Sequence, residues 1–229
     1  MAIQNGDFVK LSYTGNANGI VFDTTEEETA KKADIHSPSS LYGPVTICVG
    51  QKHVIAGLDE ELVGKEAGAE ADLAVPPEKA FGEHDPKKIQ SYQKSKFKDK
   101  PVRGMRINIE EMGEGTVVDV IGSRVIVDFN SPLAGQTINY HYKIDEIVTD
   151  PLAELKGLVR LYSGRDLEIV LADSRATVTL PAGINYDRRW LLWHARIIHE
   201  CFELINGISE ISLVETFKKP EKKDEPKSE

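Results

Sequence analysis

Histidine and cysteine are the side chains that could bind a transition metal or act as activated nucleophiles, and their spacing argues against both roles. The chain has six histidines and two cysteines. His194 and His199 stand five residues apart, off a common helix face, and His199-Glu200 lacks the second histidine of an HExxH zinc motif. Cys48 and Cys201 show no metal-binding spacing. We therefore expect no metal site, no cofactor, and two reduced, mostly buried thiols.

A second set of residues has a more informative spacing, and it is apolar and aromatic. Its four motifs are Leu11-Ser12-Tyr13-Thr14-Gly15, Gly19-Ile20-Val21-Phe22-Asp23, Val54-Ile55-x-Gly57-Leu58-x-Glu60 and Pro76-Pro77-Glu78-Lys79-Ala80-Phe81-Gly82. A strand pattern that ends at Gly50 precedes the third motif. Each motif alone is a weak signal, whereas all four in this order and at this spacing form a strong one.

These four motifs resemble those of the FKBP-type peptidyl-prolyl cis/trans isomerases. The resemblance covers residues 1–150, with one large interruption. It implies an α+β fold in which an antiparallel sheet wraps around a short helix. It also implies a cytoplasmic folding helper that isomerises X-Pro bonds, needs no cofactor, and holds unfolded polypeptides without ATP, as a chaperone. The absence of a GxxxxGK[ST] nucleotide loop from the sequence agrees with this.

The resemblance also assigns ten residues to a substrate pocket. The implied catalytic residues are Tyr13, Asp23, Ile55, Phe81 and Tyr140, and the implied substrate-binding residues are Phe22, Val45, Val54, Leu58 and Leu133. Asp23 stands at the family's pocket carboxylate, and the Ile55 N–H stands at the donor to a substrate carbonyl. The chain departs from well-known members at two positions, because Leu58 replaces an indole at the pocket floor and Phe81 replaces a tyrosine. His53 and His84 flank this predicted pocket, and we expect both to be exposed at the surface; the alternative is that they modulate substrate binding.

The charge and hydropathy of the chain limit the classes of partner that it can bind. The net charge of −9 argues against wholesale nucleic-acid binding. The hydrophobic fraction of 40% and the charged fraction of 28% are typical of globular proteins. No apolar run approaches the roughly 20 residues that a membrane-spanning helix needs. The N-terminal residues also lack the apolar stretch of a signal peptide. We therefore expect a cytoplasmic protein without membrane or nucleic-acid partners.

Period-2 alternation predicts the strands of the first part. Residues 7–13, 20–22, 45–49, 71–75 and 138–144 alternate or continue an alternating pattern. Thr25-Glu26-Glu27-Glu28 predicts a capping box at the start of a short helix. Leu58 to Val63 predicts a second short helix, closed by Gly64.

Between Pro86 and Asn130 the composition becomes basic. Six Lys and three Arg stand against three Asp and three Glu, a net charge of +3. A Lys-rich, loop-like run precedes three strand patterns at residues 105–109, 116–121 and 124–129, and Gly122-Ser123 predicts a type II′ hairpin turn. SlyD-like and long archaeal FKBP-type isomerases carry an insert-in-flap chaperone domain at this point, so the resemblance extends to residues 86–130. The isomerase domain is then residues 1–85 plus 131–150.

A third part, residues 151–217, is predicted to be an α+β domain. It contains a hairpin around Asp173-Ser174-Arg175, a long helix over residues 187–206 and a final strand over residues 209–217. It resembles the C-terminal domain of the long archaeal members, and residues 218–229 are predicted to be disordered. The helix is apolar over a wide arc that includes Trp190 and Trp193. We therefore expect a homodimer through this domain; the alternative is that Leu155 to Leu161 folds back over the surplus face.

Two other functions fit parts of the sequence. A non-catalytic peptide-binding or holdase module could keep the fold without the reaction, given Leu58 at the pocket floor. A ribosome-associated factor could use the basic insert, although the net charge of that insert is small. The favoured partners remain unfolded or partly folded polypeptides that contain X-Pro bonds.

Overall fold

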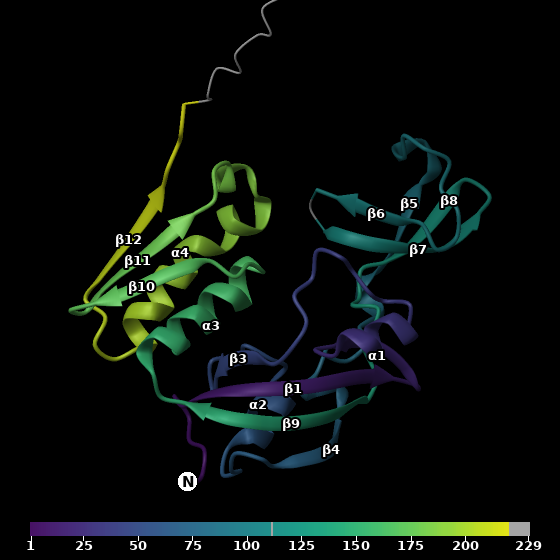
Figure 1. The fold of residues 1–229 in the computed structure, drawn as a ribbon. Coiled ribbons are helices and arrows are strands. Elements are labelled where there is room, and N and C mark those ends of the chain that lie inside the picture. The colour runs from purple at the N-terminus through teal and green to yellow at the C-terminus, as the bar shows by residue number, and fades with distance from the viewer. Residues whose placement is uncertain (111, 220–229) are drawn as a thin grey trace, which may run out of the picture.

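The computed structural model describes residues 1–110 and 112–219, and within them the chain folds around three separate sheets (Figure 1). A five-stranded sheet lies at the base of the view, a four-stranded sheet stands at its upper right, and a three-stranded sheet with two helices stands at its upper left. Helices and mostly antiparallel strands are mixed, so the predicted α+β class is confirmed.

The five-stranded sheet has the order β2-β1-β9-β4, with β3 paired to β1. All its pairings are antiparallel. Its strands are β1 (Phe8–Ala17), β2 (Ile20–Thr24), β3 (Val45–Cys48), β4 (Glu70–Val75) and β9 (Ile138–Val148). The β1–β2 turn consists of Asn18 and Gly19, both with positive φ, as the twist of a two-residue hairpin requires.

Both faces of this sheet are covered at the end where β1 pairs with β3, which follows from the alternation along these two strands. Val9, Leu11 and Ile47 are fully buried against the helix α2 (Ala56–Leu62) on one face. Phe8 and Cys48 point to the opposite face and are buried against the C-terminal part of the chain. Since successive side chains of a strand alternate sides, one short stretch contributes to two hydrophobic cores.

Helix α1 (Glu27–Lys32) begins differently from the prediction. Its N-cap is Glu26, without a side-chain cap hydrogen bond, so the predicted Thr25 capping box is wrong. The Thr25 hydroxyl instead accepts the Tyr13 N–H at 2.9 Å and lies within 3.2 Å of the Tyr13 carbonyl oxygen. A tertiary contact with β1 therefore replaces the local cap. A short 3-10 helix, η1 (Pro77–Lys79), follows β4.

The insert forms the four-stranded sheet, in the order β5-β8-β7-β6. Its elements are η2 (Pro86–Lys88), β5 (Ile89–Gln93), η3 (Lys94–Lys96), β6 (Arg106–Ile109), β7 (Gly113–Ile121) and β8 (Arg124–Asp128). Strand β5 lies in the run predicted to be loop-like, so that prediction was incomplete. At the β7–β8 turn Gly122 has φ 59°, as a type II′ turn requires. Three fully buried side chains, Val117, Val125 and Val127, form the small core of its described residues.

The C-terminal part consists of a three-stranded sheet and two helices packed together. Its elements are α3 (Pro151–Ser163), β10 (Glu168–Ala172), β11 (Arg175–Leu180), η4 (Ile184–Tyr186), α4 (Arg188–Leu204) and β12 (Glu210–Glu215). Strand β12 pairs parallel to β11. Helix α3 was not among the predicted elements. It starts at Asp150, whose carboxylate accepts the Ala153 N–H, and ends at the left-handed Gly164.

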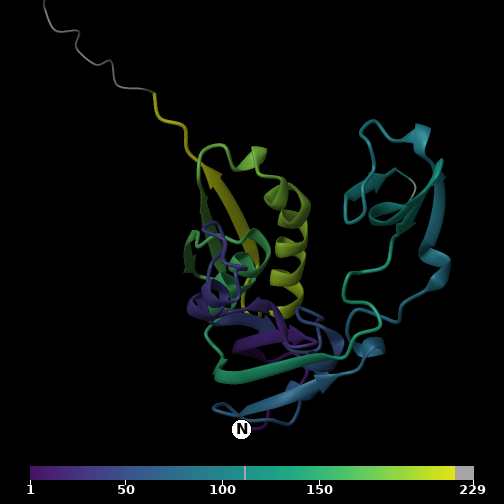
Figure 2. The same cartoon turned by 90° about the vertical axis from the view of Figure 1, so that its right-hand side faces the viewer.

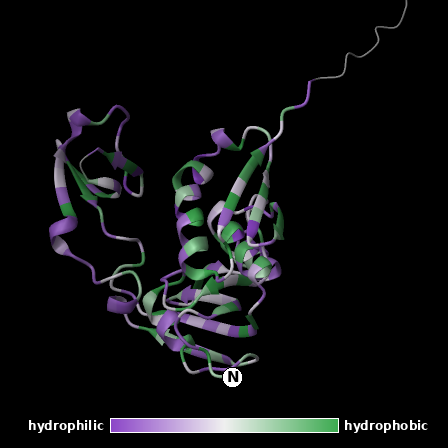
Figure 3. Ribbon diagram, turned by 90° about the vertical axis from the view of Figure 1, so that its left-hand side faces the viewer, coloured by the Kyte–Doolittle hydropathy of each residue, from purple (hydrophilic) through white to green (hydrophobic). Residues whose placement is uncertain are grey.

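Helix α3 covers part of the apolar arc of α4. Leu155, Leu158 and Val159 of α3 share one buried cluster with Trp190 and Ile197 of α4. Green hydrophobic and purple hydrophilic residues nonetheless alternate along α4 (Figure 3), and Leu191 and Phe202 keep 53% and 45% of their surfaces exposed.

The predicted tail lies mostly in residues 220–229, which are outside the described residues.

The insert and the C-terminal part rise from the same side of the five-stranded sheet, as two perpendicular views show (Figures 1 and 2). No helix among the described residues is long and apolar enough to cross a membrane.

The contact between α3 and β3 gives a first stability prediction. A Cβ on Gly157 of α3 would lie 2.4 Å from the Thr46 Cβ. Alanine gains about 1 kcal/mol of helix propensity over glycine, but forcing a methyl group into a packed interface costs about 1–3 kcal/mol. We therefore expect Gly157→Ala to lower the thermal unfolding midpoint by several degrees, measured by circular dichroism. Lys156→Ala, at the exposed neighbouring position, is the control. A midpoint at or above wild type in Gly157→Ala would contradict this close packing.

Candidate active site

Four aromatic rings meet at one end of the five-stranded sheet. Tyr13 and Tyr140 have ring centroids 5.7 Å apart, Phe22 and Phe81 5.7 Å, and Phe22 and Tyr140 6.3 Å. All three pairs are edge-to-face, the arrangement that the charge distribution of aromatic rings favours. Strands β1, β2 and β9 and the segment after η1 therefore bring these residues together from four places in the sequence.

Glycine at position 15 makes this close approach possible. Gly15 pairs with Tyr140 across β1 and β9. A Cβ there would lie 2.8 Å from the Tyr140 ring and 3.0 Å from the Phe22 ring, closer than side chains pack. Any other residue would displace the rings, so the glycine of the first motif has a packing reason.

Asp23 supplies a carboxylate beside the rings. The Tyr13 hydroxyl donates to Asp23 Oδ2 at 3.0 Å. The Asp23 side chain retains solvent contact, yet loss of part of its hydration raises its pKa, while hydrogen bonds from Tyr13 and the Thr24 backbone lower it. Burial, and then the nearby Asp23, raise the pKa of Tyr13, so its hydroxyl stays protonated and remains a donor.

Val54, Ile55 and Leu58 lie where the 50–55 loop enters α2. Leu58 is 1% exposed and belongs to the same apolar cluster as the four rings. The Ile55 carbonyl accepts hydrogen bonds from the Leu58 and Asp59 amides, whereas among the described residues no acceptor takes the Ile55 N–H. Asp59, which the sequence analysis did not single out, accepts the Gly50 and Lys52 N–H groups at 2.9 and 3.1 Å and so fixes the loop.

Phe81 and Leu133 lie on the two chain segments that lead into and out of the insert. Both pack, partly buried, against the same apolar cluster. The Gly135 N–H donates to the Gly82 carbonyl at 2.8 Å, which ties the two segments together. The base of the insert is thus part of the architecture around the rings.

A cavity of about 280 Å³ opens beside this cluster. Tyr13, Phe22, Asp23 and Val45 line it, whereas Val54, Ile55, Leu58, Phe81, Leu133 and Tyr140 contact the same apolar cluster without lining this cavity. Its opposite wall comes from the C-terminal part, through Gly157, Arg160, Leu161, Gly164 and Arg189. No local sequence pattern indicates which face of the sheet α3 covers, so this wall was not among the predicted site residues.

The histidines and cysteines behave mainly as structural residues. No group of three or more metal-ligating side chains occurs in residues 1–110 and 112–219. Both cysteines are buried, which raises the pKa of each thiol to about 12. The prediction that His53 lies at the surface is wrong, because its side chain is 1% exposed. His84 stays largely exposed and lies 2.9 Å from Asp128 of the insert.

The arrangement suits binding chemistry rather than covalent chemistry. It offers an apolar aromatic surface, the Asp23 carboxylate and the Ile55 N–H, which has no acceptor in the part of the chain that the structure describes. Such a site can hold a small apolar ring and a neighbouring carbonyl oxygen without forming a bond to either.

Comparison with known families matches all three parts of the chain. The family model described as FKBP-type peptidyl-prolyl cis-trans isomerase matches residues 1–98. The model described as FKBP26, IF domain matches residues 89–133, and the one described as FKBP26 C-terminal matches residues 153–218.

Whole-protein relatives agree with the family models. A short-type peptidyl-prolyl cis-trans isomerase of Methanocaldococcus jannaschii is 34% identical over 148 residues, which are 63% of this chain and 94% of that protein. The FKBP-type isomerase SlyD of Treponema pallidum is 32% identical over 68% of this chain and 85% of its own length. The chain belongs to the FKBP-type peptidyl-prolyl cis-trans isomerases.

Proposed function

We propose that this enzyme accelerates the cis/trans isomerisation of X-Pro bonds in folding polypeptides, at the aromatic cluster of Tyr13, Phe22, Phe81 and Tyr140. One observation supports the proposal: the four rings share one apolar cluster with Leu58, Asp23 accepts the Tyr13 hydroxyl beside them, and the Ile55 N–H on the adjoining loop has no acceptor among the described residues.

The reaction needs no covalent step. Twisting the amide breaks its resonance, which sets a barrier of about 18–20 kcal/mol. A catalyst lowers this barrier by binding the twisted amide better than either planar form. The twisted amide has a more amine-like nitrogen and a less polar C–N unit, so an apolar surface around the prolyl ring favours it.

The remaining groups would orient the substrate. The Ile55 N–H would donate to a substrate carbonyl, which holds the chain while the X-Pro bond rotates. Asp23, held by Tyr13, would place a fixed charge beside a dipole that changes during rotation. Val45, Val54 and Leu133 would contact the residues next to the proline.

An isomerisation assay on a proline-containing tetrapeptide tests the proposal with the full chain. Catalysis proportional to enzyme concentration is the expected result. The alternative, a peptide-binding module without catalysis, predicts that the same peptide binds without acceleration, which a binding measurement in parallel would reveal.

We also propose an ATP-independent chaperone activity for the insert. The insert exposes several large apolar side chains, and Val102 and Ile121 are 55% and 62% exposed. Met112, at 38%, adds a flexible thioether of the kind found on adaptable binding surfaces. Such a surface would hold unfolded segments close to the proline site.

The exposed residues of α4 support a homodimer through the C-terminal domain. Leu191 and Phe202 lie about three turns apart on the same side of the helix, and both remain largely exposed although α3 covers the other side. We expect analytical ultracentrifugation at micromolar concentration to show a dimer, and Leu191→Glu to convert it to a monomer. Lys156→Ala on α3 should remain dimeric. A wild-type monomer would refute the dimer.

A further inference from the structure

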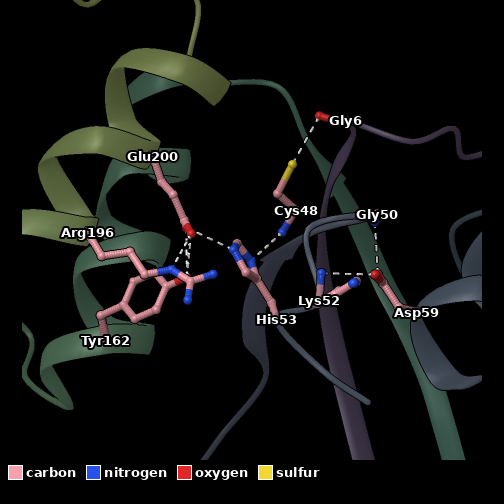
Figure 4. A network of polar contacts seen from close by, with 9 residues as sticks. All are labelled: Gly6, Cys48, Gly50, Lys52, His53, Asp59, Tyr162, Arg196 and Glu200. Carbon is pink, nitrogen blue, oxygen red and sulfur yellow. Dashed lines mark hydrogen bonds and ion pairs between the residues drawn. The ribbon is translucent and has the colours of Figure 1, made fainter. Parts of the chain in front are cut away.

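A buried polar network joins the isomerase domain to the C-terminal domain (Figure 4). His53 Nε2 lies 2.9 Å from Glu200 Oε2 of α4, across 147 residues of sequence. The Tyr162 hydroxyl donates to both Glu200 carboxylate oxygens at 2.8 Å, and Arg196 Nε donates to Oε1 at 2.6 Å. The side chains of His53 and Glu200 are 1% and 9% exposed, so solvent screens their interaction little.

The hydrogen bonds assign the His53 tautomer. The Cys48 backbone N–H donates to His53 Nδ1 at 3.0 Å, so that nitrogen carries no proton. The proton therefore lies on Nε2 and is donated to the Glu200 carboxylate. Burial lowers the pKa of His53 and outweighs the opposing influence of Glu200. The lowered pKa keeps the imidazole ring neutral at pH 7. Arg196 and Tyr162 outweigh the burial of Glu200 and hold its pKa below the ordinary value.

The network acts on the loop that carries the substrate donor. His53 lies two residues before Ile55, whose N–H has no acceptor among the described residues. Asp59 holds the start of the same loop through the Gly50 and Lys52 amides, from within the isomerase domain. His53 is held on one side by Cys48 and on the other by Glu200, so the end of the loop depends on the C-terminal domain.

We propose that Glu200 is a positioning residue for the isomerase reaction, which fixes the 50–55 loop through His53 and thereby aims the Ile55 N–H at the substrate carbonyl. This inference rests on the proposed function. The C-terminal domain then supports catalysis in its own chain, although none of its polar groups needs to touch the prolyl ring.

The test compares Glu200→Ala, Glu200→Gln and His53→Ala in the full chain, each assayed well below its own unfolding temperature. A lost loop-anchoring hydrogen bond should lower kcat/KM on a proline tetrapeptide about fivefold in Glu200→Ala. Glu200→Gln should recover most of this loss, because its amide oxygen still accepts from His53 Nε2. Glu200→Ala and His53→Ala should not add in the double variant, since both act through one contact. Glu203→Ala, on the exposed side of the same helix, is the matched control.

The amide signal of Ile55 in a ¹H–¹⁵N spectrum gives a readout that does not depend on turnover. It should shift in Glu200→Ala and His53→Ala and stay in place in Glu203→Ala. An unmoved signal together with wild-type kcat/KM in Glu200→Ala would overturn the inference and leave Glu200 as an interdomain contact alone; additive losses would do the same. If the wild-type chain shows no turnover, the proposed function fails, while the Ile55 signal still reports whether Glu200 holds the loop.

Discussion

Replacing Asp23 with asparagine is expected to lower kcat/KM on a proline tetrapeptide about tenfold or more, without loss of thermal stability. Asparagine keeps the shape of the side chain, and its Oδ1 can still accept the Tyr13 hydroxyl that Asp23 accepts at 3.0 Å. The negative charge is removed, and one acceptor oxygen becomes an NH2 donor. The amide dipole changes as the X-Pro bond twists, so a fixed charge beside it interacts unequally with the planar and twisted forms.

The stability part of this prediction follows from the pKa of Asp23. Partial desolvation in the folded state raises that pKa above the ordinary aspartate value. The folded protein therefore binds this proton more readily than the unfolded chain does, and the ionised carboxylate opposes folding above the raised pKa. That opposition disappears as pH falls through the raised pKa. Asparagine is neutral at every pH, so we expect Asp23→Asn to match or exceed the wild-type unfolding midpoint at pH 7.

The control for this variant is Asp34→Asn. Asp34 is exposed after α1 with φ 58°, a conformation that asparagine also adopts readily. It should change neither activity nor midpoint. An Asp23→Asn enzyme with unchanged kcat/KM would remove Asp23 from the site, and an activity loss that follows a drop in the midpoint would indicate a structural role.

The sequence predicted those features that short stretches of chain determine. Alternation along residues 7–13 located β1, although the strand continues to Ala17 because its pairing with β9 extends further than the alternating run. The family resemblance assigned Tyr13, Phe22, Phe81 and Tyr140 to one pocket without any knowledge of distances, and in the structure the four rings share one apolar cluster. The requirement for Gly15 between two rings became visible only with the structure.

Features that depend on distant contacts were not predictable in this way. The Thr25 hydroxyl could cap α1 locally, but it accepts the Tyr13 N–H of β1 instead, and sequence spacing does not reveal such competition. Strand β5 was missed because its apolar residues, Ile89 and Tyr92, stand within a lysine-rich run. His53 was predicted at the surface because its partner Glu200 belongs to another domain. The α3 wall of the cavity was missed for the same reason.

Removal of residues 87–130 is expected to separate the isomerisation of short peptides from the proposed chaperone activity. A tetrapeptide is small enough to fill the proline site alone, so its kcat/KM should stay within about twofold of wild type. Under the proposed chaperone function a folding chain would also contact the insert, and tethering beside the site would raise its effective concentration there. We therefore expect the acceleration of a proline-limited refolding reaction to fall about 10- to 100-fold, with a parallel loss of aggregation suppression.

The structure shows where the cut can be closed. Asn130 Oδ1 accepts the Asp85 N–H at 2.9 Å, so the two ends of the insert lie side by side and a short glycine linker can join them. The Gly135–Gly82 hydrogen bond lies outside the deletion and should keep Phe81 in place. A second variant, Val102→Ser with Ile121→Ser, keeps the insert and removes two exposed apolar side chains. It should reproduce part of the refolding defect and none of the tetrapeptide defect. Equal losses on peptide and protein substrates after the deletion would show instead that the insert only supports the proline site.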